Sequence, residues 1–523
     1  MSLADLLGAV CSEPERVESA RGTVILLCSD LAGDGLALGE LTSVLGDRLP
    51  EADVVVVEHL CEHPAAAARA LRAAGSARAV IGVCRRGVPE AELRGRARSG
   101  GSPTGGIDIV RVPRTRGVAP AATVLAAAAA RLELMPSGEP ARAVPTPGGF
   151  SRAALFRLTP AVSLLPVAAV AAERCIGVSR CGLCVEACPA RAISSRDDTA
   201  TVVSSACETC GRCVAACPVG AVHIAGATRA QLQAQLAELL AEPFPAGVLF
   251  ACAGAVETLD DEPALDDWAV VELPALALVT LGWVLQALAG GAPRVHLRPC
   301  AGACCSQWRE GGASLELCRA LLPTALAGRV TAGARVPSAP VLSEAPAAAA
   351  HRLDLAEPQA TTLALRSLGV DDLVVEHPAA PLGLVHVGAA CTVCSACASA
   401  CPTGALELVD GENTIVLLHD PGLCTGCGLC ARVCPERVID VTRGLDLRRL
   451  GGRLELASAR KHRCRRCGAP LPPAAVVERN RRLLAGTWPL LAGMPDDLCP
   501  PCAHRGDTIG LSDAPQALAE RRS

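Results

Sequence analysis

Residues 390–408 read ACTVCSACASACPTGALEL, and the last of the four cysteines in this stretch lies immediately before a proline. Their spacing is C-x2-C-x2-C-x3-C-P, formed by Cys391, Cys394, Cys397, Cys401 and Pro402. Two neighbouring disulfides or a metal site would each explain such a run. The rest of the chain decides between them, and it repeats the pattern as Cys424, Cys427, Cys430, Cys434 and Pro435.

The cysteine content and the N-terminus together favour metal ligation. The chain has 29 cysteines in 523 residues, and its first residues, MSLADLLGAVCSEPERVE, contain no basic segment ahead of the apolar stretch. We therefore expect no secretory signal and a cytoplasmic location, where disulfide frameworks are rare. The longest apolar run, residues 273–289, is short for a membrane span and predicts a buried helix instead.

The composition indicates several globular domains without a general affinity for nucleic acid. A chain of this length exceeds a single core, and 50% of its residues are hydrophobic. The net charge of −4 gives no broad attraction to nucleic acid or to anionic membranes. With four Phe, four Trp and no Tyr, the chain has little surface for stacking on bases.

The doubled pattern resembles the ligand runs of the bacterial two-cluster ferredoxins. In that family three cysteines of a run surround one [4Fe–4S] cube, and the fourth, before the proline, binds the neighbouring cube. The resemblance implies two crossed sets. One is Cys391, Cys394, Cys397 and Cys434, and the other is Cys424, Cys427, Cys430 and Cys401. The alternative is zinc or a chance pattern, and the repeated spacing with both prolines argues against it.

A second pair of runs lies earlier in the chain, and one of its runs is irregular. Cys207, Cys210, Cys213 and Cys217 have the standard spacing, whereas Cys175, Cys181, Cys184 and Cys188 have five residues after the first cysteine. Val178 stands where the standard spacing has a ligand. We expect the longer loop to let Cys175 reach its cluster, with an altered or labile cluster as the alternative. The predicted sets are Cys175, Cys181, Cys184 and Cys217, and Cys207, Cys210, Cys213 and Cys188.

Between the cysteine units, the chain predicts two α/β domains with parallel sheets. Short β-branched runs such as TVILLC (23–28) and ARAVIGVC (77–84) alternate with Ala- and Leu-rich helical stretches. The alternation returns with GVLFAC (247–252) and RVHLRPC (294–300). We predict a multi-domain α/β and α+β protein in which two parallel-sheet α/β domains alternate with two bacterial-ferredoxin-like domains, plus a small C-terminal zinc-ribbon-like tail. The predicted boundaries are 1–135, 160–228, 243–336, 382–444 and 455–510.

Cysteines at the ends of the predicted strands are candidates for further clusters. Cys28, Cys61 and Cys84 each follow a strand, at the edge where open parallel sheets place ligands, and Cys11 precedes the first strand. In the second α/β domain the candidates are Cys252, Cys300, Cys304, Cys305 and Cys318. Four of these five thiols would suffice for a [2Fe–2S] or similar cluster. The alternative in both domains is buried structural cysteine.

The C-terminal tail carries two CxxC pairs, Cys464 with Cys467 and Cys499 with Cys502. Four thiolates in this arrangement predict a tetrahedral zinc site, with rubredoxin-like iron or no metal as the alternatives. The surrounding residues 460–466 read RKHRCRR. We interpret this basic run as a solvated face, and docking to an acidic redox partner is the next hypothesis.

The α/β stretches resemble two redox families more loosely. VILLCSD, HLCEHP and VIGVCRRGVPEAELR resemble the N-terminal part of the flavin-bearing subunit of heterodisulfide reductase, a family in which cysteines at such positions contribute to a cluster. The stretch from VLFACAGA to RPCAGACCSQWREGG is similar to the iron–sulfur (delta) subunit of methyl-viologen-reducing hydrogenase. Glu272 and Leu273 stand where that family has a middle-strand cysteine. No stretch resembles the flavin domain of heterodisulfide reductase.

The sequence contains no recognisable nucleotide-binding motif: neither G-x-G-x-x-G after a strand nor G-x-x-x-x-G-K-[ST] is found. We therefore predict a non-catalytic electron-transfer component that relays single electrons through at least four [4Fe–4S] clusters. Its expected setting is a hydrogenase-like or heterodisulfide-reductase-like complex, and its expected partner is a flavoprotein or a hydrogenase-type subunit. The alternatives are a disulfide reductase with an open cluster near Cys300–Cys305 and, less favoured, a zinc- and cluster-containing nucleic-acid-binding protein.

Overall fold

The computed structural model describes two compact units of the chain. The first comprises Met1–Ala356 and Leu363–Gly369, and the second comprises Glu357–Thr362 and Val370–Ser523, so that α14 (Glu357–Ser367) contributes residues to both. The described residues are 22–63, 65–74, 78–84, 106–113, 117–135, 141–145, 162–241, 246–256, 265, 267–300, 305, 308, 312–338, 357–484, 497–499 and 501–502.

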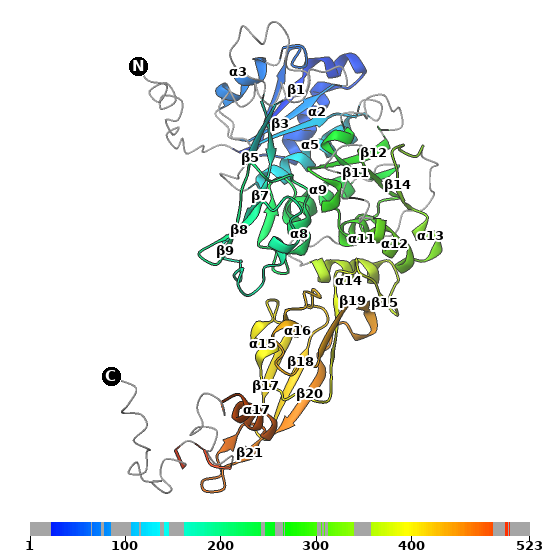
Figure 1. Ribbon diagram of the computed structural model, residues 1–523. Helices are drawn as coiled ribbons and strands as arrows, with labels where there is room; N and C mark the ends of the chain where they lie inside the picture. The colour runs from blue at the N-terminus through cyan, green and yellow to red at the C-terminus, as the bar shows by residue number, and fades with distance from the viewer. Residues whose placement is uncertain are drawn as a thin grey trace, which may run out of the picture. The chain divides into compact units, whose positions relative to one another are not determined.

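A four-stranded parallel sheet with the strand order β2-β1-β3-β4 opens the first unit (Figure 1). Strands β1 and β3 are buried along their whole length, which explains why their sequences are continuous apolar runs. Gly82 of β3 allows helix α5 to pack closely, because a Cβ there would lie 2.9 Å from Leu27 Cδ2 and 3.2 Å from Leu125 Cδ2. The elements are β1 (Val24–Cys28), η1 (Ser29–Asp34), α2 (Leu38–Arg48), β2 (Asp53–Val57), α3 (Ala65–Ala74), β3 (Ala79–Val83), β4 (Ile107–Arg111) and α5 (Val118–Glu133).

A second parallel sheet in the same unit has the order β12-β11-β13-β14, so the prediction of two parallel-sheet regions is confirmed. The prediction of one buried helix over 273–289 is wrong in its extent. Strand β12 ends at Leu273, and α11 begins only at Leu281. Pro274 favours extended backbone before it and has no N–H to donate, so a helix is broken here. The elements are β11 (Gly247–Cys252), α10 (Ala253–Val256), β12 (Trp268–Leu273), η3 (Leu276–Leu278), α11 (Leu281–Ala289), β13 (Val295–Arg298), α12 (Gly312–Leu321), α13 (Thr324–Ala327) and β14 (Val330–Ala332).

The segment between the two sheets consists of short antiparallel pairs and short helices. Strand β5 pairs with β6, β7 with β10, and β8 with β9. These strands are β5 (Ala141–Pro145), β6 (Val162–Pro166), β7 (Ala168–Val170), β8 (Ile193–Arg196), β9 (Thr199–Val202) and β10 (Val222–Ile224). The helices are α7 (Leu183–Glu186), α8 (Arg212–Ala216) and α9 (Arg229–Ala241).

Arginines of α2 and α5 join elements from different parts of the first unit. Arg48 pairs with Glu238 of α9, with 2.8 Å between Nη2 and Oε2. Arg131 forms a buried ion pair with Asp108 of β4, and it also donates to the carbonyl oxygen of Glu272 in β12 at 3.2 Å. Charged contacts therefore link the helices of the first sheet to α9 and to the second sheet.

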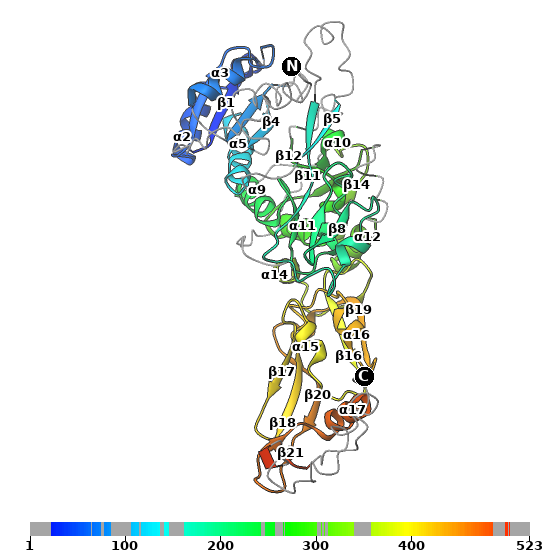
Figure 2. The same cartoon turned by 60° about the vertical axis from the view of Figure 1, so that its left-hand side comes forward.

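The second unit contains two three-stranded antiparallel sheets, with the orders β15-β19-β16 and β17-β18-β20, and the antiparallel pair β21-β22 (Figure 2). Strand β20 lies beyond residue 444, the predicted C-terminal boundary of the second ferredoxin-like domain, and pairs with β18. No helix in the described part of the chain is long and apolar enough to cross a membrane. The elements are β15 (Val374–Glu376), β16 (Gly383–Val387), α15 (Ala396–Ala400), β17 (Leu406–Asp410), β18 (Thr414–His419), α16 (Leu429–Val433), β19 (Ile439–Asp446), η5 (Leu447–Arg449), β20 (Leu454–Arg460), β21 (His462–Arg463), β22 (Pro470–Leu471) and α17 (Ala474–Leu484).

Candidate metal centres

The four cysteine runs share one local design, in which a loop leads into a short helix that carries the third cysteine. These helices are α7 with Cys184, α8 with Cys213, α15 with Cys397 and α16 with Cys430. The residue before each helix has a left-handed backbone, with φ of 64° at Gly182, 78° at Gly211, 71° at Ser395 and 74° at Gly428. Glycine adopts this conformation without a steric cost, which explains its presence in three of the four runs.

One cavity of the first unit is lined by Cys175, Cys181, Cys184 and Cys217, which we call site I. The long loop after Cys175 is closed by Asp198, whose carboxylate accepts hydrogen bonds from Ser179 N at 2.8 Å and Ser179 Oγ at 2.9 Å. The hydrogen bond from Ser179 N also holds the pKa of Asp198 below its usual value. The inserted residues therefore form a closed loop, and Cys175 keeps its place in the cavity.

A second cavity of the first unit is lined by Cys188, Cys207, Cys210 and Cys213, which we call site II. Cys188 belongs to the run that otherwise lines site I, and Cys217 of site I belongs to the run that otherwise lines site II. The backbone N–H groups of Ala192 and Ala221 donate to Cys188 Sγ and Cys217 Sγ, each at 3.2 Å. The structure thus brings the two crossed sets of this unit together.

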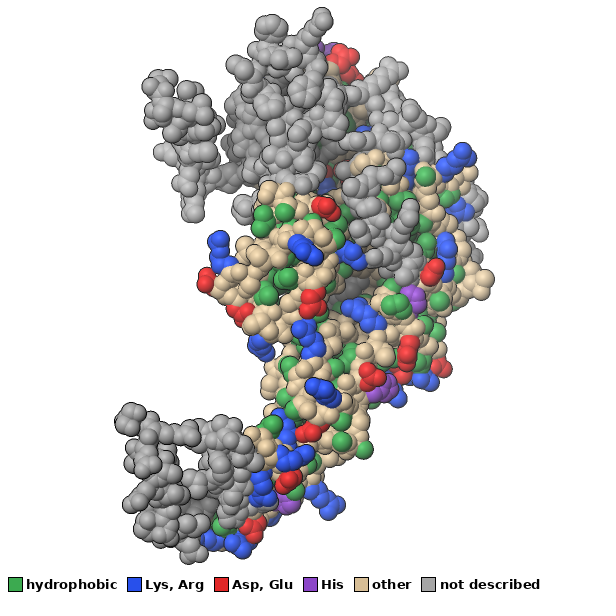
Figure 3. All heavy atoms as spheres, viewed as in Figure 1, with side chains coloured by type: hydrophobic (Ala, Val, Ile, Leu, Met, Phe, Trp, Pro, Cys, Tyr) green, Lys and Arg blue, Asp and Glu red, His purple; other side chains and the backbone are tan. Residues whose placement is uncertain are grey.

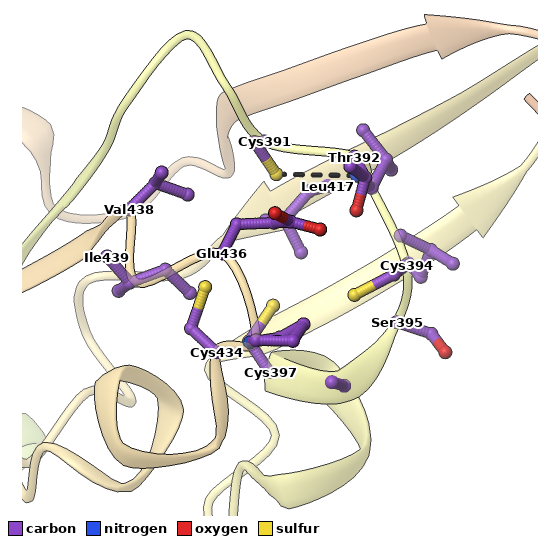
Figure 4. Close-up of a pocket in the computed structure, with 14 residues that line it drawn as sticks. Cys391, Thr392, Cys394, Ser395, Cys397, Leu417, Cys434, Glu436, Val438 and Ile439 are labelled. Carbon is purple, nitrogen blue, oxygen red and sulfur yellow. Dashed lines mark hydrogen bonds between the residues drawn. The ribbon is translucent and has the colours of Figure 1, made fainter. Parts of the chain in front are cut away.

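In the second unit, Cys391, Cys394, Cys397 and Cys434 line one cavity, which we call site III (Figure 4). The other lining residues are mainly apolar, among them Val393, Leu417 and Ile439. The backbone N–H of Val393 donates to Cys391 Sγ at 3.4 Å. Val393 has a φ of 54°, which is unusual for a β-branched residue.

The remaining four cysteines of the two runs in the second unit, Cys401, Cys424, Cys427 and Cys430, are called site IV. Burial, and then the nearby thiolates of Cys427 and Cys401, raise the pKa of the Cys424 thiol to about 11. The charge of Cys401 thus acts on Cys424, a cysteine of the other run. Gly383 leaves room for Cys424, because a Cβ at this position would lie 2.9 Å from its Sγ.

The electrostatics of these sites favour a bound cation. Burial raises the pKa of Cys184 and Cys397 to about 11 and that of Cys213 and Cys430 to about 12, and neighbouring thiolates add to each shift. Four thiolates in an apolar cavity repel one another unless a cation compensates their charge. Four converging thiols are also the usual donor set of a [4Fe–4S] cube, so the residues fit this cofactor.

Comparison with known families identifies the two cysteine units as iron–sulfur domains. Residues 171–221 and 390–438 each match the family described as a 4Fe-4S dicluster domain. The first match contains sites I and II, and the second contains sites III and IV. A search of curated proteins found no match. The predicted ferredoxin-like character of both segments is therefore confirmed, and the chain carries two such domains.

Three further thiols meet at the carboxyl edge of the first parallel sheet. The sulfur atoms of Cys28, Cys61 and Cys84 lie within 4.8 Å of one another, and all three residues are buried. We call this group the first edge site. A hydrogen bond with Cys61 lowers the pKa of Cys28 to about 6, and the same contact raises the pKa of Cys61. Cys11, the fourth candidate, lies outside the described residues.

A similar group, the second edge site, lies at the carboxyl edge of the second sheet. The sulfur atoms of Cys252, Cys300 and Cys305 lie within 4.8 Å of one another. The register places Leu273 beside Cys252, so an apolar side chain ends the neighbouring strand. Cys318 of α12 is buried outside this group, and burial raises its pKa to about 12. Cys304 lies outside the described residues.

The tail also gathers its four cysteines. The sulfur atoms of Cys464, Cys467, Cys499 and Cys502, here called the tail site, lie within 4.8 Å of one another, and three of these residues are buried. Cys464 and Cys467 occupy the turn between β21 and β22, and Cys499 N donates to Cys464 Sγ at 3.4 Å. This donor set suits a tetrahedral metal ion.

The basic run beside the tail site is partly neutralised by the chain itself. Lys461 pairs with Asp410 at 2.5 Å, Arg465 pairs with Asp497 at 3.4 Å, and Arg463 pairs with Glu412 at 3.9 Å. On the face shown in Figure 3, basic and acidic side chains of the second unit are interspersed. Nearby carboxylates therefore offset part of the positive charge of the run 460–466.

Two polar neighbours of the thiols were missed by the sequence analysis. Asp30 accepts from Cys28 Sγ at 3.6 Å, and its other carboxylate oxygen lies 2.7 Å from His59 Nδ1. Glu436 lines site III directly after Pro435. A comparison of the residues that follow each proline would have singled out Glu436, because the other three are Ala190, Val219 and Thr403.

Proposed function

We propose that this chain is an electron-transfer subunit that holds one [4Fe–4S] cluster at each of sites I to IV. The observation that carries the proposal is the crossed lining of sites I to III, in which Cys217, Cys188 and Cys434 each lie with cysteines of the partner run. Such sharing keeps the two sites of a pair adjacent, as a relay of single electrons requires. When bound, the clusters supply reversible one-electron chemistry.

The residues of the chain hold and tune these cofactors. The thiolates of each set bind the iron, and the apolar lining excludes water from the cavity. Backbone N–H groups of Val393, Ala192 and Ala221 stabilise negative charge on the sulfur atoms. Hydrogen bonds of this kind, together with burial, are the means by which a protein sets a cluster's reduction potential.

The edge sites and the tail site extend the proposal. The first edge site offers three buried thiols for a further iron–sulfur cluster. The second edge site also offers three thiols for a cluster, and Leu273 lies beside one of them, Cys252. The tail site offers four thiols for zinc. Because a relay of single electrons needs a partner for two-electron chemistry, we propose that the partner is a flavoprotein or a hydrogenase- or heterodisulfide-reductase-type subunit.

A second candidate function is the reduction of a disulfide or small thiol substrate at the second edge site. It is favoured by Cys300, which is only partly buried, whereas Cys252 and Cys305 are buried. Reoxidation of the reduced protein by a disulfide, absent when Cys300 is changed to serine, would support this function over a simple relay.

Anaerobic reconstitution of the full chain, followed by analysis of iron, sulfide and zinc, tests the main proposal. Four filled cubes require about sixteen iron atoms per chain, and filled edge sites raise this number. Fewer than about twelve iron atoms would contradict the four-cluster proposal. The reduced protein should show the EPR signals of [4Fe–4S] clusters and should pass electrons to artificial one-electron acceptors without a bound flavin.

A further inference from the structure

Site III has a carboxylate at its wall that is held by an ion pair. Among the described residues that line it, Glu436 alone is acidic. Its side chain points into the space that Cys391, Cys397 and Cys434 face (Figure 4). The carboxylate also contributes to raising the pKa of Cys391, after burial and the nearer thiolates. Its charge therefore acts on the ligands of this site.

Glu436 is held by a cation from a distant segment of the second unit. Arg479 of α17 places its Nε 3.4 Å from Glu436 Oε1, and the two side chains are only 20% and 22% exposed. The contact is one of charge, because Arg479 Nε makes no hydrogen bond within the described residues. A partly buried pair is screened by water less than a surface pair, so both charges are felt at the site.

The linings of sites I and II contain no such pair among the residues that the structure describes. The residue after the proline is Ala190, Val219 or Thr403 in the other three runs, and none of these carries a charge. Glu208 lines site II, but it is exposed to water, which screens its charge. Site III is thus distinguished from sites I and II by the combination of an acidic wall residue, low exposure and a fixed cation.

We infer that Glu436 and Arg479 set the reduction potential of the cluster at site III and make it unequal to that of site IV. This inference rests on the proposed function. Reduction adds one negative charge to the cluster, so Glu436 disfavours reduction and lowers the potential, whereas Arg479 favours it. The balance of the two charges then determines which cluster of the pair holds the electron.

The test uses two variants of the full chain that break the same ion pair but remove opposite charges. Glu436→Gln should raise the midpoint potential of one [4Fe–4S] component in an EPR-monitored redox titration, and Arg479→Gln should lower that of the same component. We expect about a tenfold change in the equilibrium constant for reduction, which is about 59 mV for a one-electron couple. Glu208→Gln, at the exposed carboxylate of site II, is the matched control, and we expect it to change the midpoint potential of its cluster less.

The outcomes separate this inference from the proposed function. Opposite shifts at unchanged iron content support the inference, and Arg479→Lys, which keeps the cation, should stay closer to the wild type than Arg479→Gln. Shifts of the same sign, or none, would overturn it and leave the relay intact. If one variant loses iron, the other variant still tests the inference, because a raised potential is expected for Glu436→Gln and a lowered one for Arg479→Gln. A wild-type chain without clusters would overturn both.

Discussion

Asp198 shows how one side chain accommodates an irregular spacing. The loop from Cys175 to Cys181 is too long for the standard run, and its ends are held by backbone bonds such as Cys181 N to Gly177 O at 3.0 Å. Asp198 adds two hydrogen bonds to Ser179 from the turn between β8 and β9. The loop is thereby fixed by a residue that lies far from it in sequence.

We predict that Asp198→Ala weakens site I and leaves site II loaded. Without the carboxylate the loop loses both contacts to Ser179, so Cys175 is held less firmly and the cluster is released more readily. The reconstituted chain should lose up to about four iron atoms on exposure to a chelator. Asp197→Ala is a matched control, because Asp197 and Asp198 both have left-handed backbones, with φ of 49° and 62°. Equal iron retention in the two variants would contradict this role of Asp198.

At this scale the sequence predicted the thiols but not their supports. Cysteine spacing is a local signal, so a grouping of the sixteen thiols could be proposed before the fold was known. Asp198 and Arg479 contact residues that are distant in the sequence. The sequence of an exposed turn or an amphipathic helix does not show which residues it will contact. The role of such residues depends on tertiary packing and could not be read from spacing.

Strand β18 illustrates how an element can carry a buried titratable group. His419 at its end is 2% exposed, and its Nε2 has no hydrogen-bond partner within the described residues. Burial lowers its pKa from 6.5 to about 4. Asp420 beside it favours the charged form but does not offset the burial. The imidazole is therefore neutral in the folded protein near neutral pH.

We predict that His419→Leu reduces the loss of stability of the second unit in mild acid. Below about pH 6.5 the unfolded chain gains a proton on this histidine that the folded chain does not bind, so stability falls as the pH is lowered toward about 4. The contribution is at most about 1.4 kcal/mol per pH unit. Urea unfolding at about pH 7.5 and pH 5 should show a smaller difference for the variant. His462→Leu, at an exposed position, is the control, and equal slopes for wild type and His419→Leu would refute the prediction.

Elements were predicted well where their burial leaves a continuous pattern in the sequence. Strands β1, β3 and β11 are buried on both faces, and their apolar runs indicated a parallel sheet. The run 273–289 was misread because a buried strand end and a buried helix have the same apolar composition. Strand β20 is half-exposed and pairs with β18 across a bulge, so its place in the sheet had no comparable signal.

At the scale of the whole molecule, the crossed sets make a directional prediction. Cys401→Ser should damage the cluster at site IV, although Cys401 belongs to the run that otherwise lines site III. The ligand set of site III stays complete, so its EPR signal should persist while about four iron atoms are lost. Cys318→Ala, which removes a buried thiol outside the metal sites, controls for general damage. Loss of the site III signal with site IV intact would disprove the crossed assignment.

The sharing of cysteines between runs also has a consequence for biosynthesis. As the chain leaves the ribosome, Cys391, Cys394 and Cys397 appear first, yet site III lacks its last thiol until Cys434 has been added. Cys401 likewise waits for the cysteines from Cys424 to Cys430. On the proposed ligand sets, neither cube of the pair can be closed during synthesis of the first run. Cofactor insertion then becomes one late event for the pair, and a fragment truncated between the two runs should mature neither cluster.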